Sequence, residues 1–451
     1  MENWRRHAGL AVALVLLTIV PALDVRGEDA SGPLTLGALG IKGTAAFKNY
    51  SQFYRTNNDS QNFVDQGILQ VEWARELARW VTVRAAVEAR GDDDDFTDGV
   101  TFQILEKDKQ RSVLSLREFV VRFRGGPVEA TFGKQFFAWG TADAYNPTDL
   151  INPYDYMDVV DNEKIGVYSA AAWATAGPAS LVFVVIPAFA PSRLPLPSGR
   201  WSPDPPPGFV GIVDNREVPA LTAANMQYAA RARATVKGVD LSVSYYDGFE
   251  HLPVLRQSAV NVAPGFALPR FTPVFARVKA PGIDFSTTYR KFEFHGEGSF
   301  RLVEANGRDD RFQWIAGSSY TWDELPVRWM EQIVFTLEYA REEILSSRER
   351  SQIVELGTLP GLGELLSTRA FRNALAARIV FKFNEETQLK LSGTLDLIGS
   401  PSSYLQPKIT HKVTDALHAE AGLDCFTGSG QTFWGRWRHN ARFFLLMKYF
   451  F

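Results

Sequence analysis

The sequence has little cysteine, no excess of basic residues and no later stretch long enough for a membrane-spanning helix. One of its 451 residues is cysteine, Cys425, which excludes an internal disulfide framework, a cysteine-rich zinc site and a haem attached through paired cysteines. Lys and Arg number 48 against 51 Asp and Glu, so the formal net charge is −3. This balance argues against a general nucleic-acid-binding protein, which needs cations to neutralise phosphates. With 45% hydrophobic residues, the chain is too apolar to be disordered.

The first 27 residues have the pattern of a secretory signal peptide. Arg5 and Arg6 form a basic start, and an apolar stretch follows from Ala8 to Val20. Small residues near position 27 provide a cleavage site. The apolar stretch is short for a membrane span, which needs about 20 residues, so we prefer a cleaved signal to an uncleaved anchor. Residues 28–451 are then expected to form one domain outside the cytoplasm.

The rest of the chain alternates between apolar and polar residues. In residues 239–245, Val239, Leu241, Val243 and Tyr245 share one parity, and Asp240, Ser242 and Ser244 share the other. Residues 81–90, 333–339, 375–382 and 389–397 alternate in the same way. Because successive side chains of a strand point to opposite faces, each segment has an apolar and a polar face. The pattern predicts an all-β protein.

The connections between these segments fall into two length classes. Short turns are expected at Gly125-Gly126-Pro127, Gly177-Pro178, Lys237-Gly238, Pro281-Gly282, Asn384-Glu385-Glu386 and Thr414-Asp415. Long connections run from Asp92 to Ser112, Ala138 to Lys164, Ala188 to Thr222, Glu250 to Phe271 and Ile344 to Ala370. A soluble sandwich also alternates, but its connections do not separate in this way. We therefore predict a transmembrane antiparallel β-barrel with short periplasmic turns and long extracellular loops.

The turns also predict the number of strands. A first strand near Leu36 to Lys48, eight hairpins and a last strand from Ala441 to Phe451 give about 18 strands. Between Tyr289 and Phe292 the apolar parity switches, and a misassigned strand in residues 271–304 would leave 16. A barrel of either size encloses a water-filled lumen.

The polar faces carry charges of both signs in nearly equal number, so they predict no simple preference for anions or cations. Such charges suit a wet lumen and not an apolar core. The candidate lumen charges are Arg84, Arg122, Arg124, Arg231, Arg233, Glu293, Glu297, Arg301 and Arg378, and those at a constriction would set selectivity.

Residues 138–164 are the candidate constriction loop. The residues singled out are Trp139, Asp143, Tyr145, Asn146, Asp149, Asn152 and Tyr156. Two Asn-Pro steps limit the freedom of the backbone, so the segment is suited to fold into the lumen and narrow it. An ordered outer cap is equally compatible with the sequence. If the loop lies inside, its aspartates and tyrosines are expected to meet wall arginines such as Arg122 and Arg124.

Two segments carry a family resemblance. The final residues alternate up to Tyr449 and Phe451, similar to the terminal strand through which the barrel-assembly machinery recognises bacterial outer-membrane proteins. Trp139-Gly140, Asn146-Pro147-Thr148-Asp149 and Asn152-Pro153, together with Phe433-Trp434-Gly435-Arg436 and the residues that follow, resemble an uncharacterised proteobacterial porin-like outer-membrane β-barrel family. The resemblance implies a transport-related barrel in the bacterial outer membrane, in contact with the lipid bilayer and lipopolysaccharide. It does not extend to the classical trimeric porins.

Two main functional hypotheses follow. The first is a channel through which small hydrophilic solutes pass. The second is a structural barrel that sheathes a partner, for example a multihaem cytochrome, or that serves an export system. His295 beside Glu293 and Glu297 hints at acid–base chemistry, but strand geometry alone places the three on one face, so we expect no enzyme. We expect no cofactor or metal site and no nucleic-acid partner, and a homo-oligomer stays open.

Overall fold

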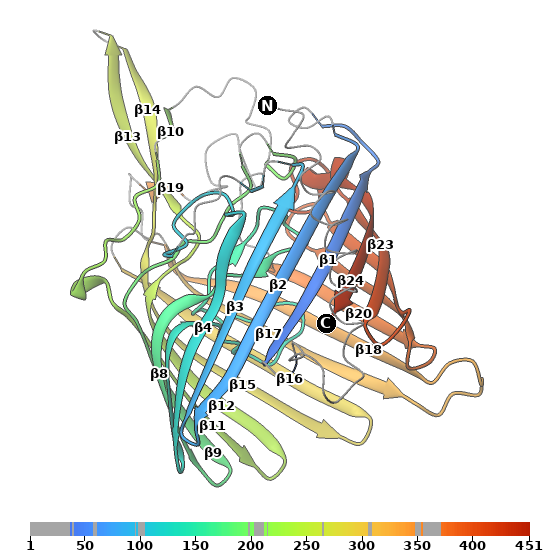
Figure 1. The fold of residues 1–451 in the computed structure, drawn as a ribbon. Coiled ribbons are helices and arrows are strands. Elements are labelled where there is room, and N and C mark those ends of the chain that lie inside the picture. The colour runs from blue at the N-terminus through green and yellow to red at the C-terminus, as the bar shows by residue number, and fades with distance from the viewer. Residues whose placement is uncertain are drawn as a thin grey trace.

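One closed sheet of 18 antiparallel strands dominates the computed structural model (Figure 1). The structure describes residues 37, 40–56, 61–94, 96–97, 104–196, 199–202, 212–213, 215–263, 266–304, 309–347, 353–354 and 371–451. The predicted signal peptide, residues 1–27, lies outside the described residues. Among the described residues, no helix combines the length and the apolar character that a bilayer crossing requires.

The barrel strands differ in length but follow one another around the wall. They are β1 (Ile41–Gln52), β2 (Phe63–Ala78), β3 (Val81–Asp92), β4 (Leu114–Gly125), β5 (Val128–Gln135), β8 (Val167–Ala176), β9 (Ala179–Ile186), β11 (Gln227–Val236), β12 (Val239–Phe249), β15 (Arg277–Tyr289), β16 (Phe292–Val303), β17 (Asp309–Trp322), β18 (Gln332–Ser347), β20 (Asn373–Lys382), β21 (Thr387–Asp396), β22 (Ser402–Lys412), β23 (Leu417–Thr427) and β24 (Arg442–Phe450).

The first and last strands close the barrel. β1 pairs with β2 on one side and with β24 on the other, from Thr44 opposite Phe450 to Gln52 opposite Arg442. Closure leaves the sheet without an open edge, which is what a sheet in hydrocarbon requires. The prediction of an all-β barrel of 18 antiparallel strands is confirmed, and the alternative of 16 is wrong.

Eight connections lie at one end of the barrel, the turn side, and the other connections lie at the opposite end, the loop side. Seven of the eight have two to four residues, and the one between β17 and β18, residues 323–331, has nine. One predicted turn was wrong. Pro281 and Gly282 lie inside β15, and the chain turns at Arg290 and Lys291 instead, with a positive φ of 57° at Arg290. This turn explains the switch of parity between Tyr289 and Phe292. Pro281 fits within a strand because the ladder to β16 skips Ala280 and Pro281, where an N–H would be missing.

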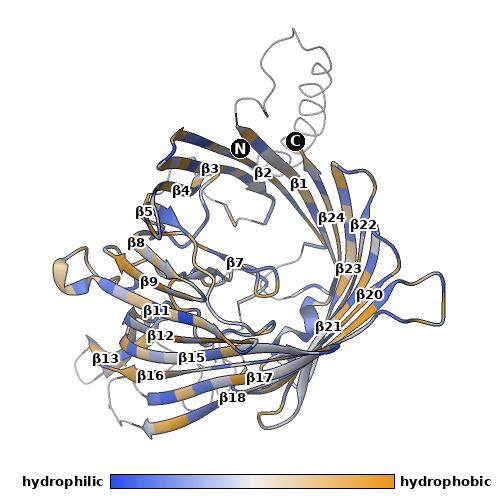
Figure 2. Ribbon diagram, turned by 90° about the horizontal axis from the view of Figure 1, so that it is seen from below, coloured by the Kyte–Doolittle hydropathy of each residue, from blue (hydrophilic) through white to orange (hydrophobic). Residues whose placement is uncertain are grey.

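The wall has an apolar outer face and a polar inner face. On β12, the outward side chains of Leu241 and Val243 are 42% and 56% exposed, whereas the inward Ser242 is 3% exposed. The strands in Figure 2 accordingly change colour from residue to residue. An apolar outer surface of this extent needs a non-aqueous environment, because soluble monomers rarely expose such patches.

Strand β9 is an exception, since it is apolar on both faces. Leu181 and Phe183 point outward, and Val182, Val184 and Ile186 are buried on the inside. The inner wall around β9 therefore offers an apolar surface for something inside the barrel to cover.

Smaller elements lie outside the barrel wall. A second sheet on the loop side consists of β10 (Ile212–Val213), β13 (Val254–Ala263), β14 (Phe266–Val274) and β19 (Ile353–Val354). Its hairpin β13–β14 stands away from the barrel at the upper left of Figure 1 and occupies most of the stretch predicted as a long connection from Glu250 to Phe271. The remaining elements are β6 (Tyr154–Asp155), β7 (Glu163–Lys164) and the short helices η1 (Ala223–Asn225) and η3 (Gly435–Asn440).

Candidate functional site

The candidate site is loop L3, defined as residues 136–166 between β5 and β8. It leaves the loop side of β5 and includes the small β6–β7 ladder. In the view along the barrel, β7 lies within the ring of strands (Figure 2). Hydrogen bonds and ion pairs join L3 to inward-facing residues on several strands, as described below. L3 therefore lies against the inner wall.

Glu297 on β16 anchors the first part of L3. Its Oε1 accepts the backbone N–H groups of Thr141 at 3.2 Å and Ala142 at 3.1 Å. Its Oε2 accepts the N–H of Thr148 at 3.2 Å and the hydroxyl of Thr148 at 2.6 Å. The carboxylate is 5% exposed, and four donors compensate its burial.

Gly140 makes this anchor possible. Its φ is +97°, which is strained for any side chain, and an added Cβ would lie 2.7 Å from both carboxylate oxygens of Glu297. The Trp139-Gly140 pair thus combines a bulky anchor with a residue that lets the backbone approach the wall.

Glu338 on β18 anchors the next two residues. Its Oε1 accepts the N–H of Asp143 at 2.7 Å, and its Oε2 accepts the N–H of Ala144 at 2.8 Å. His295 Nε2 lies 2.8 Å from Glu338 Oε1 and holds the carboxylate from the side of β16. The carboxylate of Asp143 itself pairs with Arg378 on β20, at 2.6 Å.

Tyr145 and Pro147 extend the contact to β17 and β16. The hydroxyl of Tyr145 donates to Gln313 Oε1 at 2.9 Å, and its ring stacks on Phe371 with centroids 5.4 Å apart. Burial raises the pKa of Tyr145, so the hydroxyl remains a donor at neutral pH. Arg301 Nη2 donates to the carbonyl of Pro147 at 2.7 Å.

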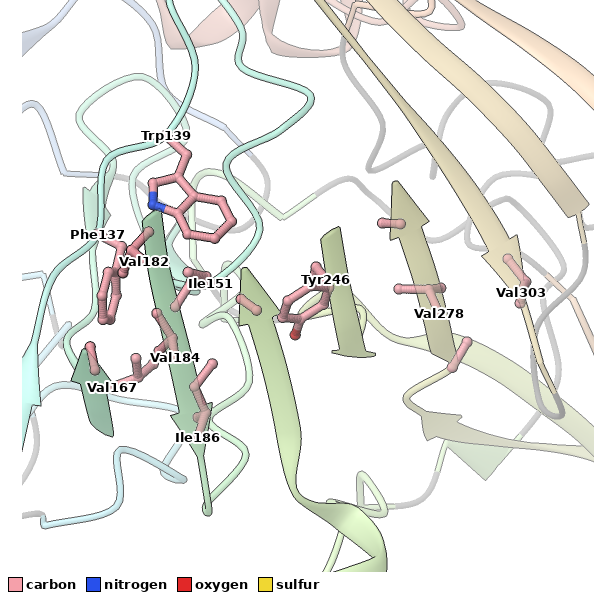
Figure 3. Packing of buried hydrophobic residues seen from close by; sticks show 14 residues of the cluster. Phe137, Trp139, Ile151, Val167, Val182, Val184, Ile186, Tyr246, Val278 and Val303 are labelled. Atoms are coloured by element: carbon pink, nitrogen blue, oxygen red, sulfur yellow. The ribbon is translucent and has the colours of Figure 1, made fainter. Parts of the chain in front are cut away.

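An apolar cluster holds L3 against the inner faces of β9 and β12. Phe137, Trp139 and Ile151 pack with Val184, Ile186 and Tyr246 of β9 and β12 (Figure 3). Burial of a side chain of this size contributes roughly 1.5–3 kcal/mol. The double-sided apolar character of β9 is therefore explained, because its inner face packs against L3 and not against water. Arg231 also lies over the ring of Trp139, 5.9 Å from the ring centroid.

The middle of L3 is tied to its own ends. Asn152 Oδ1 accepts the N–H of Phe137 at 2.7 Å, and its amide donates to the carbonyls of Gln135 and Ile165. Lys164 forms an ion pair with Asp149. Burial nevertheless raises the pKa of the Asp149 carboxyl, because desolvation outweighs the attraction of the Lys164 ammonium. The Asn146 carbonyl accepts the N–H of Asp149 at 3.1 Å, and Tyr156 stacks on Tyr154 with centroids 5.6 Å apart.

The last part of L3 contacts the strands where the barrel closes, β24 and β1, and the neighbouring strands β3 and β4. Asp158 pairs with Arg442 on β24 at 2.6 Å. Asp161 accepts hydrogen bonds from Lys48 and Tyr50 on β1, both at 2.6 Å. Burial alone would raise the pKa of Asp161, but the Lys48 ammonium and the Tyr50 hydroxyl outweigh it and lower that pKa to about 2. Glu163 pairs with Arg90 at 2.8 Å and with Arg117 at 2.9 Å. L3 is therefore bound to strands on both sides of the lumen.

The expected contact with Arg122 and Arg124 was wrong. Both arginines pair with Glu129, at 3.1 and 3.2 Å. They flank the turn at Gly126 and Pro127, whereas L3 leaves β5 from its opposite end, so the loop passes them by.

The other predicted lumen charges divide into two groups. Arg231, Glu297, Arg301 and Arg378 contact L3, as described above. Arg84 pairs with Glu72 and Glu118, Arg233 pairs with Asp240, and Glu293 is exposed close to the turn at Arg290.

Several residues that hold L3 were not singled out from the sequence. Glu338 and Arg442 lie on polar faces, but alternation does not show which wall charge will meet a loop. Gln313, Lys48 and Tyr50 gave no signal of their own.

A cavity of about 210 Å³ lies between the base of L3 and the strands β2 to β4. Its lining is mostly polar and of both signs: Gln70, Glu72, Arg84, Ala86, Arg117, Glu118, Phe136 and Lys164. A cavity with this lining and volume has room and partners for several water molecules.

The two residues of the predicted insertion signal lie at the closure. Tyr449 pairs with Ala45 of β1 and with Leu417 of β23. The backbone N–H and carbonyl of Phe451 bond to Gly43, at 3.0 and 2.9 Å, and its ring lies over the space that a side chain at Gly43 would fill. The last residue thus continues the pairing of the final strand with β1.

A solved structure of a porin shares this fold. A BenF-like porin from Pseudomonas fluorescens Pf-5 is 10% identical, with a TM-score of 0.50, over 91% of this chain and 98% of that chain. A triple mutant of Rh. blastica porin is 10% identical, with a TM-score of 0.40, over 91% of this chain and 99% of that chain. No protein-family model and no curated protein matches the sequence. At this identity the likeness shows the fold of a porin-like β-barrel.

Proposed function

We propose that this protein is an outer-membrane porin-like channel for small hydrophilic solutes. The observation that carries the proposal is the two-faced wall of the closed barrel. Apolar side chains cover its outside, and charged or polar side chains line its inside. In a lipid bilayer the outside would be solvated by acyl chains, and the lumen would hold water. The loop side would then face the outside of the cell and the turn side the periplasm.

Loop L3 would form the constriction of this channel. Its contacts with β16, β18 and β20 and with β1 and β24 support this role, because a loop tied to separate parts of the wall narrows the lumen at a fixed place. A constriction made by a firmly anchored loop sets the size and charge of what passes. The residues that would border it include Asp143 and Arg378. They form an ion pair, and the side chain of each is more than one-third exposed.

The sheath hypothesis is less well supported. A barrel that encloses a partner protein needs an open cross-section, and L3 occupies part of it. The partners that we propose are the lipid bilayer and lipopolysaccharide around the wall and the barrel-assembly machinery at the terminal strand ending in Phe451. Association with further copies of the chain is compatible with the apolar outer wall.

Ionic conductance tests the proposed function. The purified chain without residues 1–27 is added to planar bilayers in KCl, and single-channel steps are recorded. We expect stable, discrete steps of current. Heat-dependent mobility in gel electrophoresis shows whether the preparation contains folded barrels. A folded preparation that carries no current would contradict the proposal and favour a closed sheath.

A further inference from the structure

The pairing of β1 with β24 differs from every other pairing in the barrel wall. All other neighbouring strands of the wall are consecutive along the chain, so a turn or a loop joins them. β1 and β24 belong to opposite ends of the chain, and nine residue pairs align them. We call this pairing the closure seam. Its loop-side end lies between loop L1, residues 53–62 after β1, and loop L9, residues 428–441 before β24.

A third loop reaches the closure seam from the far side of the barrel. Loop L4, defined as residues 187–226, connects β9 to β11, and seven strands of the wall lie between this connection and the seam in one direction and eleven in the other. L4 lies against L3, because the backbone N–H of Arg193 donates to the carbonyl of Tyr154 at 3.0 Å. Further along, Arg200 and Trp201 are buried at the seam, with 3% and 2% of their surface exposed.

The guanidinium of Arg200 binds L1 and L9 together. Its Nη1 donates to the carbonyl of Tyr54 at 2.9 Å and to the carbonyl of His439 at 3.4 Å. Its Nη2 donates to the carbonyl of Gln61 at 2.9 Å. In return, the side-chain amide of Asn440 donates to the carbonyl of Arg200 at 3.1 Å. Tyr54 and Gln61 belong to L1, and His439 and Asn440 belong to L9, so one side chain of L4 bridges the two loops.

Trp201 adds a second bridge. Its carbonyl accepts the indole N–H of Trp437 in L9 at 3.3 Å. The guanidinium of Arg442 on β24 lies 5.1 Å from the centroid of the Trp201 ring and 4.0 Å from the centroid of the Tyr50 ring on β1. A cation between two aromatic rings is attracted to both of them. L4 therefore contacts the closure seam at the two strands as well as at the two loops.

We propose that L4 is a strap that locks the closure seam and that Arg200 is its clasp. The inference goes beyond the proposed channel function and does not depend on it. Separation of β1 from β24 at the loop side would pull L1 away from L9 and remove acceptors from the buried guanidinium of Arg200. A buried charge without acceptors is costly, so the seam stays closed while Arg200 is bound. Arginine suits this task because its planar guanidinium donates to several carbonyl groups at once.

Hydrogen exchange, measured by mass spectrometry on the folded protein in detergent micelles, tests the strap. In Arg200→Ala, the amides of residues 49–52 and 442–445 should exchange at least about tenfold faster than in the wild type, because several hydrogen bonds to a charged group are lost. The hairpin of β15 and β16 lies away from the seam and should exchange at an unchanged rate. Unchanged exchange at the seam in Arg200→Ala would overturn the inference.

The matched control is Arg193→Ala. Arg193 is also a buried arginine of L4, but it pairs with Glu106 between β3 and β4 and with Asp155 of L3. Its loss should speed exchange in L3 and leave the closure seam unchanged. Equal acceleration at the seam in the two variants would show that any loosening of L4 opens the seam, and would overturn the role of Arg200 as the clasp.

A disulfide across the closure seam provides a second test, which also serves if Arg200→Ala does not fold. Ser51 on β1 and Phe443 on β24 lie directly opposite each other, so Ser51→Cys and Phe443→Cys in a Cys425→Ser background place two thiols at the distance that a disulfide needs. The oxidised disulfide should let Arg200→Ala fold and return exchange at the seam to the wild-type rate. Faster exchange around the intact disulfide, or failure to fold in its presence, would mean that Arg200 acts elsewhere and would overturn the inference.

Discussion

Single buried carboxylates decide where L3 lies. Glu297 on β16 and Glu338 on β18 each accept backbone N–H groups of L3. A carboxylate that accepts several N–H groups fixes the backbone more firmly than a neutral side chain would. The position of L3 thus depends on two side chains of the wall, on β16 and β18.

Glu338→Gln tests this dependence. The change replaces one carboxylate oxygen with an NH₂ group, which cannot accept a loop N–H, at a cost of about 1–3 kcal/mol to the anchor. We expect larger fluctuations of the open-channel current than in the wild type. Glu293→Gln, at an exposed site close to the turn, is the control and should leave the current unchanged. Quiet current in Glu338→Gln would mean that the carboxylate does not hold L3.

The partly buried carboxylate of Asp93 predicts that stability depends on pH. Asp93 lies just beyond β3, where burial and the neighbouring Asp65 raise its pKa from 3.8 to about 6, although it accepts the N–H of Asp65 at 2.8 Å. The folded state therefore favours the protonated form. The stability that this group contributes is fully present below about pH 4 and is lost as the pH rises through about 6.

Asp93→Asn should mimic the protonated form. The midpoint temperature of its unfolding is expected to exceed that of the wild type at pH 8 and to match it at pH 4. The measurement is the temperature at which the protein loses the electrophoretic mobility of the folded barrel. Asp108→Asn, at an exposed position of the same loop, should have no effect at either pH. A lower midpoint for Asp93→Asn at pH 8 would contradict the assignment.

Among the elements, β9 shows most clearly how L3 and the wall depend on each other. Its inner residues pack on Phe137, Trp139 and Ile151, so the strand and the loop share one apolar cluster. Val184 is fully buried there, whereas Val243 on β12 points outward and is 56% exposed.

Val184→Ala and Val243→Ala separate packing inside the barrel from contact with detergent or lipid. Removing two methyl carbons at Val184 leaves a cavity and should cost roughly 1–3 kcal/mol, and it should loosen L3. Val243→Ala removes the same atoms from the outer surface and should cost less. The check is the denaturant midpoint of each variant in detergent micelles. Equal losses of stability would show that L3 does not depend on the inner face of β9.

The sequence predicts the elements better than it predicts the contacts between them. Alternation and turn residues identify the strands of the wall because both are local signals. Pro281-Gly282 misled the assignment because a turn-forming pair can lie in a strand where the neighbouring ladder is interrupted. The partners of L3 could not be predicted, because Arg378 and Asp143 meet only through the path of the loop across the lumen, 235 residues apart in sequence.

On the scale of the whole molecule, closure and alternation have one consequence. Every strand must present one parity outward and the other to the lumen, so solvent contact along a strand must change with a period of two. Strand β21 is suited to show this, since Leu389, Leu391 and Leu395 alternate with Lys390, Ser392 and Thr394.

Spin labels at positions 389–395 of β21 provide the most direct measurement. Each label is attached to a single cysteine in a Cys425→Ser background, and the protein is reconstituted in lipid vesicles. Labels at 389, 391, 393 and 395 should be relaxed mainly by oxygen dissolved in the bilayer, and labels at 390, 392 and 394 mainly by a water-soluble nickel complex. Equal access of the nickel complex to all seven positions would contradict a wall with lipid on one side and water on the other.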